Sequence, residues 1–259
     1  MEYLKTSRIT IPRTGLGTWD IRGSSGKEAI EKAIKSGYRL IDTASYYENE
    51  EIVGEAVNNS VKSGIVKRDE LFITTKIWPN EFSNPEKAIK RSMSKLNLEY
   101  VDLYLVHWPE SSLELRTKAY LGLEKASLDG ITKHIGVSNY SIVQIEELLV
   151  RSSIPPTVNQ IHVSPYRYPR SVIEYCQANE IAVQAYTPLE HGKKSDNRLI
   201  VEIAEHHSKT PEQVMLRWAV DKGMIPIPKS SNEHRQRINL DIFDFTLSQD
   251  EIGRLDTLP

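Results

Sequence analysis

The chain has 259 residues, of which 26% are charged and 39% hydrophobic, and 33 Lys+Arg against 35 Asp+Glu leave a net charge of −2. This composition is typical of a globular protein, and the near-neutral charge argues against nucleic acid or an acidic membrane as the main partner. The longest apolar run, residues 103–106, is far too short to cross a membrane. Residues 1–5 open no apolar stretch like that of a signal peptide, so we expect a cytoplasmic protein.

A short apolar run, a turn and a helical pattern recur about eight times along the chain. The strand candidates are residues 14–18, 40–42, 71–76, 101–107, 134–138, 157–160, 182–186 and 225–228. Eight strands alternating with helices predict an α/β fold, a (β/α)8 TIM barrel. A doubly wound sheet is the rival, but residues 15–20 (GLGTWD) lack the third glycine of its usual phosphate-binding turn. No linker or low-complexity segment interrupts the pattern, which predicts one domain over residues 1–259.

The remaining elements follow from local signals. Residues 3–12 are too short for a domain, and we expect a hairpin there that plugs the bottom of the barrel. Apolar residues at helical spacing mark residues 29–34 and 52–57, and Gly37 ends the first of these helices. Asn84 is predicted to cap a helix that has Pro85 at its first position. Capping-box spacing predicts three further helix starts, at Ser141 with Gln144, Thr210 with Gln213, and Ser248 with Glu251.

Almost every predicted strand has a polar residue at its carboxyl end. These residues are Asp42, Lys76, His107, Ser138, Asn139, Gln160, Tyr186 and Lys229. A barrel carries its chemistry at the carboxyl ends of its strands, and neighbouring strands lie about 5 Å apart. A carboxylate, an ammonium and an imidazole from Asp42, Lys76 and His107 should therefore converge on one point.

A phenol is expected at the same point, because the segment directly after Asp42, residues 43–49 (TASYYEN), contains Tyr46 and Tyr47. A tyrosine beside a lysine that is held by an aspartate can have its pKa lowered from about 10, which would make it a general acid near neutral pH. This set suits protonation of a carbonyl oxygen while a hydride reaches the carbon. It predicts an oxidoreductase.

Other chemistries lack their motifs. The seven histidines include no HxH or HExxH pattern, so we expect no metal, and the helical pair His206 and His207 is interpreted as a solvated face. No G-x-S-x-G turn supports a serine hydrolase. The single cysteine, Cys176, lies in a helical pattern and is interpreted as a packing residue.

A hydride donor requires a binding site, and the later strand ends suit one. Amide and hydroxyl groups of Ser138, Asn139 and Gln160 can hold a carboxamide, and Tyr186 offers a flat face for a nicotinamide ring. Residues 227–235 (IPKSSNEHR) bring a cation, hydroxyls and a helix start together, which is the usual anion site of such barrels. A phosphate bound there would be the adenosine 2′-phosphate, which favours NADPH over NADH.

These residues make the chain similar to the aldo-keto reductase family over nearly its whole length. The matching segments are residues 15–19 (GLGTW), 42–50 (DTASYYENE), 75–78 (TKIW), 105–109 (LVHWP), 136–139 (GVSN), 159–160 (NQ), 186–189 (YTPL) and 227–231 (IPKSS). Each segment is weak alone, but the ordered set is highly specific. The resemblance implies the catalytic tetrad Asp42, Tyr47, Lys76 and His107, with Tyr47 rather than Tyr46 as proton donor.

The resemblance also implies binding roles. The cofactor set that it implies is Gly17, Thr18, Asp42, Ser138, Asn139, Gln160, Tyr186, Thr187, Leu189, Lys229, Ser230, Ser231, Arg235 and Asn239. Lys229, Ser230 and Arg235 would hold the 2′-phosphate, and the backbone at Thr187 and Leu189 would follow the pyrophosphate. Many family members have Glu three residues after the phosphate-binding arginine, where this chain has Ile238. Contact with the adenine amino group is therefore expected to be weaker.

Aromatic residues flank the predicted catalytic positions and suggest the substrate. The expected substrate-binding residues are Trp19, Tyr46, Trp78, His107 and Trp108. Aromatic walls around one polar point suit small, partly apolar carbonyl compounds. Short loops and a short C-terminal segment predict an open pocket and broad specificity for small aldehydes, dicarbonyls or keto-sugars. No motif requires a macromolecular partner, so we expect a monomer or weak homodimer.

Two alternatives to the reductase stay open. One is a barrel lyase in which Lys76 forms a Schiff base with a carbonyl substrate. The cations at Lys229 and Arg235 would then serve a substrate phosphate. The other is a non-catalytic NADP(H)-binding barrel, against which the intact tetrad argues.

Overall fold

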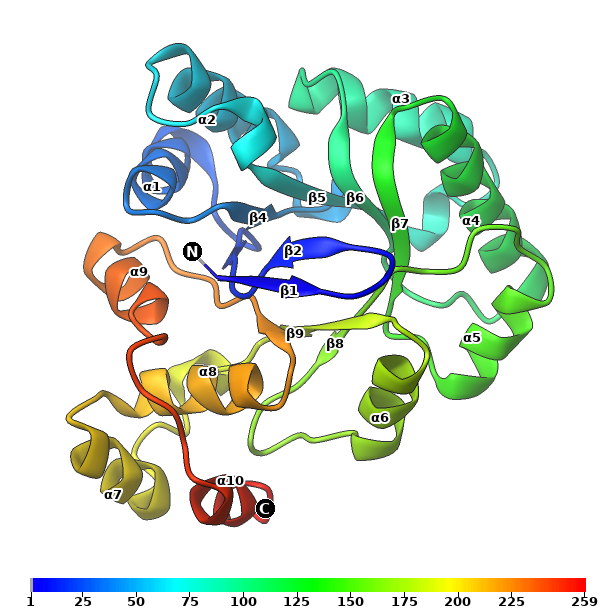
Figure 1. The fold of residues 1–259 in the computed structure, drawn as a ribbon. Coiled ribbons are helices and arrows are strands. Elements are labelled where there is room, and N and C mark those ends of the chain that lie inside the picture. The colour runs from blue at the N-terminus through cyan, green and yellow to red at the C-terminus, as the bar shows by residue number, and fades with distance from the viewer. Residues whose placement is uncertain (1) are drawn as a thin grey trace.

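In a computed structural model, which describes residues 2–259, the chain forms a parallel barrel surrounded by helices (Figure 1). The eight barrel strands are β3 (Leu16–Gly17), β4 (Leu40–Asp42), β5 (Phe72–Ile77), β6 (Val101–Val106), β7 (Thr132–Ser138), β8 (Val158–His162), β9 (Ala182–Tyr186) and β10 (Ile225–Pro226). They are hydrogen-bonded in chain order, and every neighbouring pair is parallel. The (β/α)8 prediction is confirmed.

The barrel closes between its first and last strands. A parallel bridge joins Gly17 to Lys229, and the N–H groups of Gly15 and Gly17 each donate to the chain around β10, to the carbonyls of Pro226 and Pro228 at 3.1 Å. The predicted strands at residues 14–18 and 225–228 were too long at this seam. Proline has no N–H to donate, so the ladder there is sparse and the regular strands are only two residues each.

The helices lie outside the strands. They are α1 (Gly23–Lys35), α2 (Glu50–Lys62), α3 (Pro85–Leu96), α4 (Leu113–Leu128), α5 (Ile142–Leu149), α6 (Arg170–Ala178), α7 (Arg198–His207), α8 (Pro211–Asp221), α9 (Glu233–Leu240) and α10 (Gln249–Leu255). The three predicted capping boxes are confirmed, and Asn84 caps α3, its side chain accepting from the N–H of Lys87. Gly37 follows α1 with a φ of 112°, a backbone conformation that other residues rarely adopt. Among residues 2–259, no helix is both long enough and apolar enough to cross a membrane.

Strand alternation divides the apolar side chains into two cores. In β6, Leu103 and Leu105 point into the barrel, whereas Tyr104 and Val106 pack against the surrounding helices. The interior cluster comprises Ile9, Ile11, Leu40, Phe72, Leu103, Leu105, Val158, Ala182, Ile225 and Ile227. Five strands, β4, β5, β6, β8 and β9, therefore contribute to both cores.

The predicted N-terminal hairpin is present as β1 (Tyr3–Lys5) and β2 (Thr10–Pro12), which are antiparallel. Figure 1 shows it lying across the ring of strands at one end of the barrel. Ile9 and Ile11 belong to the interior cluster, so the hairpin closes the barrel at the end where its strands begin. The opposite end of the barrel, where the strands end, is not covered by the hairpin and is where the candidate active site lies.

Candidate active site

The four predicted catalytic side chains meet at the carboxyl ends of β4, β5 and β6. Asp42 is the last residue of β4, Lys76 lies near the end of β5, and His107 directly follows β6. Tyr47 ends a short 3-10 helix, Ser45–Tyr47, that follows β4. Lys76 Nζ donates to Asp42 Oδ2 at 2.6 Å, to the carbonyl of Thr43 at 2.9 Å and to the Tyr47 hydroxyl at 3.3 Å. The barrel thus brings together residues that lie up to 65 positions apart (107 − 42).

Lys76 is held as an ammonium ion. Its side chain is fully buried beside a carboxylate that is almost as deeply buried. Burial alone would lower the pKa of Lys76, but the attraction of Asp42 and the neighbouring Tyr47 outweighs it, and the pKa is raised. A buried charge of this kind requires its partner, so Asp42 is what allows Lys76 to stay charged inside the protein.

The expected lowering of the Tyr47 pKa is wrong for this structure. Burial raises the pKa of Tyr47 above 10, and the nearby charge of Lys76 only partly opposes that rise. The phenol is therefore protonated at neutral pH. It can act as a proton donor, although it is a weaker acid than the sequence suggested.

His107 is a neutral imidazole. Burial and the charge of Lys76 lower its pKa to about 2. Its ring meets Trp78 edge-on, with centroids 4.9 Å apart, and Tyr47 at 5.5 Å. A neutral imidazole can direct a hydrogen bond to a carbonyl oxygen without adding a charge to the site.

A polar layer from β7, β8 and β9 continues the site. The side chain of Gln160 donates to Asp42 Oδ1 at 2.8 Å, and its main-chain carbonyl accepts the hydroxyl of Ser138 at 2.7 Å. Asn139 adopts a φ of 64° and donates to Ser138 Oγ at 3.0 Å, while its own carbonyl oxygen accepts the Tyr186 hydroxyl at 2.8 Å. Four candidate cofactor residues therefore form one hydrogen-bonded network with the tetrad, namely Ser138, Asn139, Gln160 and Tyr186.

A cleft of about 800 Å³ opens over this network. It is lined by all the predicted site residues except Thr18 and Lys76. Lys76 lies beneath it, in contact with Tyr47. Thr18 is fully buried and donates through its hydroxyl to the carbonyl of Asp42 at 2.9 Å, so its side chain supports the strand end and does not face the cleft.

One side of the cleft is aromatic. Tyr46 and Trp78 stack with ring centroids 3.9 Å apart and an interplanar angle of 16°. Trp19, Tyr46 and Trp108 are about half exposed, although large aromatic side chains usually lie inside. They form an open apolar wall above the tetrad.

A cationic end of the cleft lies at α9. Asn232 caps this helix and accepts the N–H of Arg235 at 3.0 Å, while Ser230 Oγ accepts the N–H of Asn232 at 3.2 Å. Lys229 and Arg235 are exposed, and neither forms an ion pair with any of residues 2–259. Two free cations beside a helix start suit a bound anion.

Eight residues that line the cleft were not predicted as site residues, namely Pro188, His191, Gly192, Thr210, Glu212, Ile227, Pro228 and Ile238. His191 and Gly192 belong to the segment after β9, in which Glu190 accepts hydrogen bonds from Ser164 at 2.6 Å and lies 3.0 Å from His162 Nε2. Thr210 and Glu212 open α8 beside α9. No catalytic or ligand-binding motif marks His191, Gly192, Thr210 or Glu212, because their place at the cleft depends on how the loop and the two helices pack.

The comparisons with known proteins agree with this geometry. The model of the aldo/keto reductase family matches residues 13–258. The methylglyoxal reductase DkgA of Yersinia pestis is 40% identical over 93% of this chain and 87% of its own length. The glyoxal reductase of Bacillus subtilis is 41% identical over 96% of this chain and 90% of its own.

A solved structure agrees as well. The aldo-keto reductase AKR2E4 of Bombyx mori, in complex with NADP, superposes with a TM-score of 0.91 and 34% identity, covering 98% of this chain and 92% of that one. The match spans the barrel, the polar strand ends and the cationic end of the cleft. The chain therefore belongs to the aldo/keto reductase family.

Proposed function

We propose that the protein is an NADPH-dependent reductase that converts small aldehydes and ketones to alcohols. The observation that carries this proposal is the hydroxyl of Tyr47, which faces the cleft and lies 3.3 Å from Lys76 Nζ, itself 2.6 Å from Asp42 Oδ2. A protonated phenol, a fixed ammonium ion and a neutral imidazole at the floor of one cleft suit carbonyl reduction.

The residues present fit a nicotinamide nucleotide. Ser138, Asn139 and Gln160 offer hydrogen-bonding groups for a carboxamide, and the ring of Tyr186 lines the cleft beside them. The unpaired cations Lys229 and Arg235 suit the 2′-phosphate. When bound, NADPH supplies the hydride. Glu212 lines the cleft together with Ile238 and Asn239, so it is the acidic group available to adenine where Ile238 offers none.

Residues of the chain donate the proton to the substrate oxygen and stabilise the negative charge that this transfer leaves on Tyr47. His107 directs a hydrogen bond to the substrate carbonyl oxygen, and Tyr47 donates its proton to that oxygen as the carbon accepts a hydride. The positive charge of Lys76, 3.3 Å from the phenol oxygen, stabilises the phenolate left behind. Asp42 keeps Lys76 charged and in place. The tyrosine recovers its proton from solvent through the open cleft.

The same contacts count against a Schiff-base lyase. A lysine nucleophile must be an uncharged amine that reaches the substrate. Lys76 does not line the cleft, its pKa is raised, and its ammonium group makes three hydrogen bonds within the protein. The cations at Lys229 and Arg235 are also at the far end of the cleft from a substrate held by His107, as an extended dinucleotide requires.

The substrate class follows from the aromatic wall. The space near Tyr47 suits a small, partly apolar carbonyl compound, because it is bordered by the aromatic side chains of Trp19, Tyr46, Trp78 and Trp108. Two relatives bear the names methylglyoxal reductase and glyoxal reductase, which supports dicarbonyls among these substrates. A cytoplasmic location and a monomeric or weakly dimeric state stay predictions.

Turnover tests the proposal directly. We expect the protein to oxidise NADPH continuously in the presence of methylglyoxal or glyoxal, and Tyr47→Phe to lower kcat at least about 100-fold while leaving the Kd for NADPH nearly unchanged. Borohydride trapping with substrate alone tests for the lyase. NADPH binding without sustained turnover would instead mark a non-catalytic barrel, and full activity of Tyr47→Phe would contradict the assigned proton donor.

Cofactor preference is a separate measurement. Titration with NADPH and with NADH, followed by quenching of tryptophan fluorescence, should give tighter binding of NADPH. Arg235→Ala should weaken NADPH binding about tenfold or more and leave NADH binding almost unchanged, because only NADPH carries the 2′-phosphate. Equal losses for the two nucleotides would contradict this role of Arg235.

A further inference from the structure

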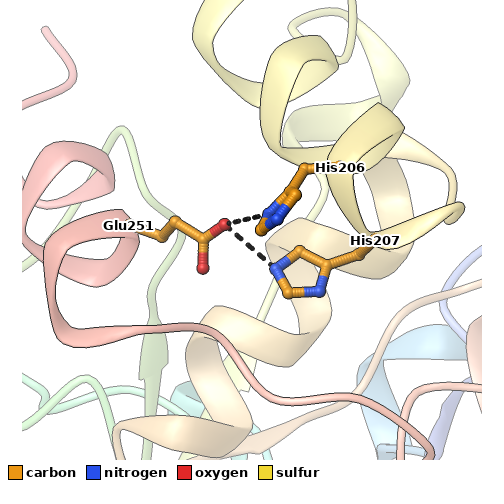
Figure 2. Close-up of side chains that lie close together, drawn as sticks. All are labelled: His206, His207 and Glu251. Atoms are coloured by element: carbon orange, nitrogen blue, oxygen red, sulfur yellow. Dashed lines mark hydrogen bonds and ion pairs between the residues drawn. The ribbon is translucent and has the colours of Figure 1, made fainter.

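A second cluster of chemically capable side chains lies outside the cleft, between α7 and α10. His206 Nδ1 and His207 Nε2 each lie 3.0 Å from the same oxygen, Oε1 of Glu251 (Figure 2). All three ligand atoms lie within 4.8 Å of one another. The interpretation of the two histidines as a solvated face is wrong for His207, whose side chain is only 16% exposed.

The backbone explains how adjacent residues converge. Consecutive side chains on a helix point about 100° apart and do not normally face one target. His206 and His207 are the last residues of α7, and each uses a different ring nitrogen, the near Nδ1 of one and the far Nε2 of the other. Figure 2 shows both rings pointing from the end of α7 towards the carboxylate on α10.

We propose that His206, His207 and Glu251 form a binding site for a divalent transition-metal ion of the zinc type. Two imidazole nitrogens and one carboxylate oxygen are a donor set that such ions prefer. Metal–ligand bonds of about 2.0–2.2 Å place neighbouring ligand atoms roughly 3.3 Å apart in a tetrahedron, close to both observed nitrogen–oxygen distances. The two nitrogens lie within 4.8 Å of each other, and metal binding would require the exposed His206 ring to rotate so that they come closer.

Hydrogen bonds from Ser248 orient the Glu251 carboxylate as a metal ligand. Glu251 Oε2 accepts the N–H of Ser248 at 2.7 Å and its hydroxyl at 2.9 Å, so the capping box fixes one oxygen and leaves Oε1 to the imidazoles.

The site is also reachable. The His206 side chain is 74% exposed, so an ion can enter from solvent and complete its coordination with water. Bound metal would join the end of α7 to α10. It would thereby tie the C-terminal helix to the segment that leads, three residues after His207, into Thr210 at the cleft.

Zinc binding to tag-free, chelator-treated protein tests this proposal, because an affinity tag of histidines would itself bind the metal. Isothermal titration should show one zinc ion per chain. His206→Ala should fold normally, since the side chain is exposed, and it should weaken zinc binding about tenfold or more. Glu251→Gln keeps a capping side chain and should weaken it similarly. His234→Ala, which removes another exposed helical histidine, is the matched control and should bind zinc like the unmodified protein.

Two further readouts distinguish the site from non-specific binding. Cobalt(II) should give visible absorption bands with the unmodified protein that are absent with His206→Ala, and zinc should raise the Tm of the former only. Absence of saturable zinc binding would overturn the proposal. Equal affinity of the unmodified protein and His206→Ala would do the same, because the metal would then be bound elsewhere.

Discussion

Burial decides the direction of the pKa shift of two predicted catalytic residues, Tyr47 and His107, whereas charged and polar neighbours decide that of a third, Lys76. Burial raises the pKa of the Tyr47 phenol and lowers that of the His107 imidazole, so both side chains are neutral at pH 7 although Lys76 lies beside them. Lys76 keeps its charge because the Asp42 carboxylate lies 2.6 Å from its ammonium group. A site of this kind holds a transferable proton on Tyr47 and a fixed positive charge next to it.

The neutral state of His107 predicts a pH dependence of stability. Above its ordinary pKa of 6.5, the imidazole is neutral in both the folded and the unfolded chain and contributes no difference. As the pH falls below 6.5, the unfolded chain takes up a proton that the folded chain, with a pKa of about 2, does not. Folding should therefore lose about 2 kcal/mol between pH 7.5 and 5 from this residue.

Urea unfolding at pH 7.5, 6 and 5 measures this loss. His107→Asn should show a smaller fall in the free energy of unfolding over the range. His234→Asn, an exposed histidine, should behave like the unmodified protein. If His107→Asn loses as much free energy of unfolding between pH 7.5 and 5 as the unmodified protein does, folding does not keep the His107 imidazole neutral.

At the scale of elements, the cleft is bounded by a loop that side chains hold in place. The segment after β9 carries positive φ angles at Thr187, Glu190 and His191, conformations that cost energy in residues other than glycine. Glu190 anchors this segment to β8 and its following loop through His162 and Ser164. His191, next to the anchor, faces Trp19 across the cleft with ring centroids 6.5 Å apart.

Removal of this anchor should release the cofactor faster. Glu190→Ala loses its contacts to Ser164 and His162, each worth about 1 kcal/mol, so NADPH should dissociate roughly three- to tenfold faster. Stopped-flow displacement of NADPH measures the rate. Glu146→Ala, an exposed position on α5, serves as the control. An unchanged rate in Glu190→Ala would show that the loop is held without this carboxylate.

At the scale of the whole molecule, the residues that stabilise the barrel and the residues of the candidate active site lie at opposite ends of the barrel axis. The hairpin β1–β2 fills one end with apolar side chains, and the polar strand ends occupy the other. In TIM barrels the first of these faces contributes to stability and the second carries the active site. Substitutions at the two ends should therefore affect different measurements.

Ile11 offers a test of this separation, because its side chain is fully buried in the interior cluster. Ile11→Ala should lower the free energy of unfolding by about 2–5 kcal/mol through loss of apolar contacts and the cavity left behind. At a temperature where the variant is folded, kcat/KM should stay within about twofold of the parent value. Ile65→Ala, at a 42% exposed position, should change neither quantity appreciably. A large loss of kcat/KM in folded Ile11→Ala would mean that the two ends are coupled.

Local patterns in the sequence were sufficient for the fold and for the convergence of Asp42, Lys76 and His107, whereas the choice of Tyr47 over Tyr46 as proton donor came from the resemblance to the family. Strand alternation, helix caps at Asn84, Ser141, Thr210 and Ser248, and polar residues at strand ends act over a few residues, so they can be recognised without the structure. Because parallel strands in a barrel end at one face, the convergence of Asp42, Lys76 and His107 followed from their positions alone. The sequence likewise determined which segments match the aldo/keto reductase family.

Other features were decided by tertiary structure. The bond from Gln160 to Asp42 joins residues 118 positions apart, and the bonds of His206 and His207 to Glu251 span 45 and 44. Glu212 reaches the cleft only because α8 begins beside α9, and Thr18 turns away from it only because its strand end is buried. The pKa of Tyr47 was expected to fall and instead rises, since desolvation depends on every segment that covers the side chain. Local sequence specifies which groups are present, whereas burial and long-range contacts determine their charge and their partners.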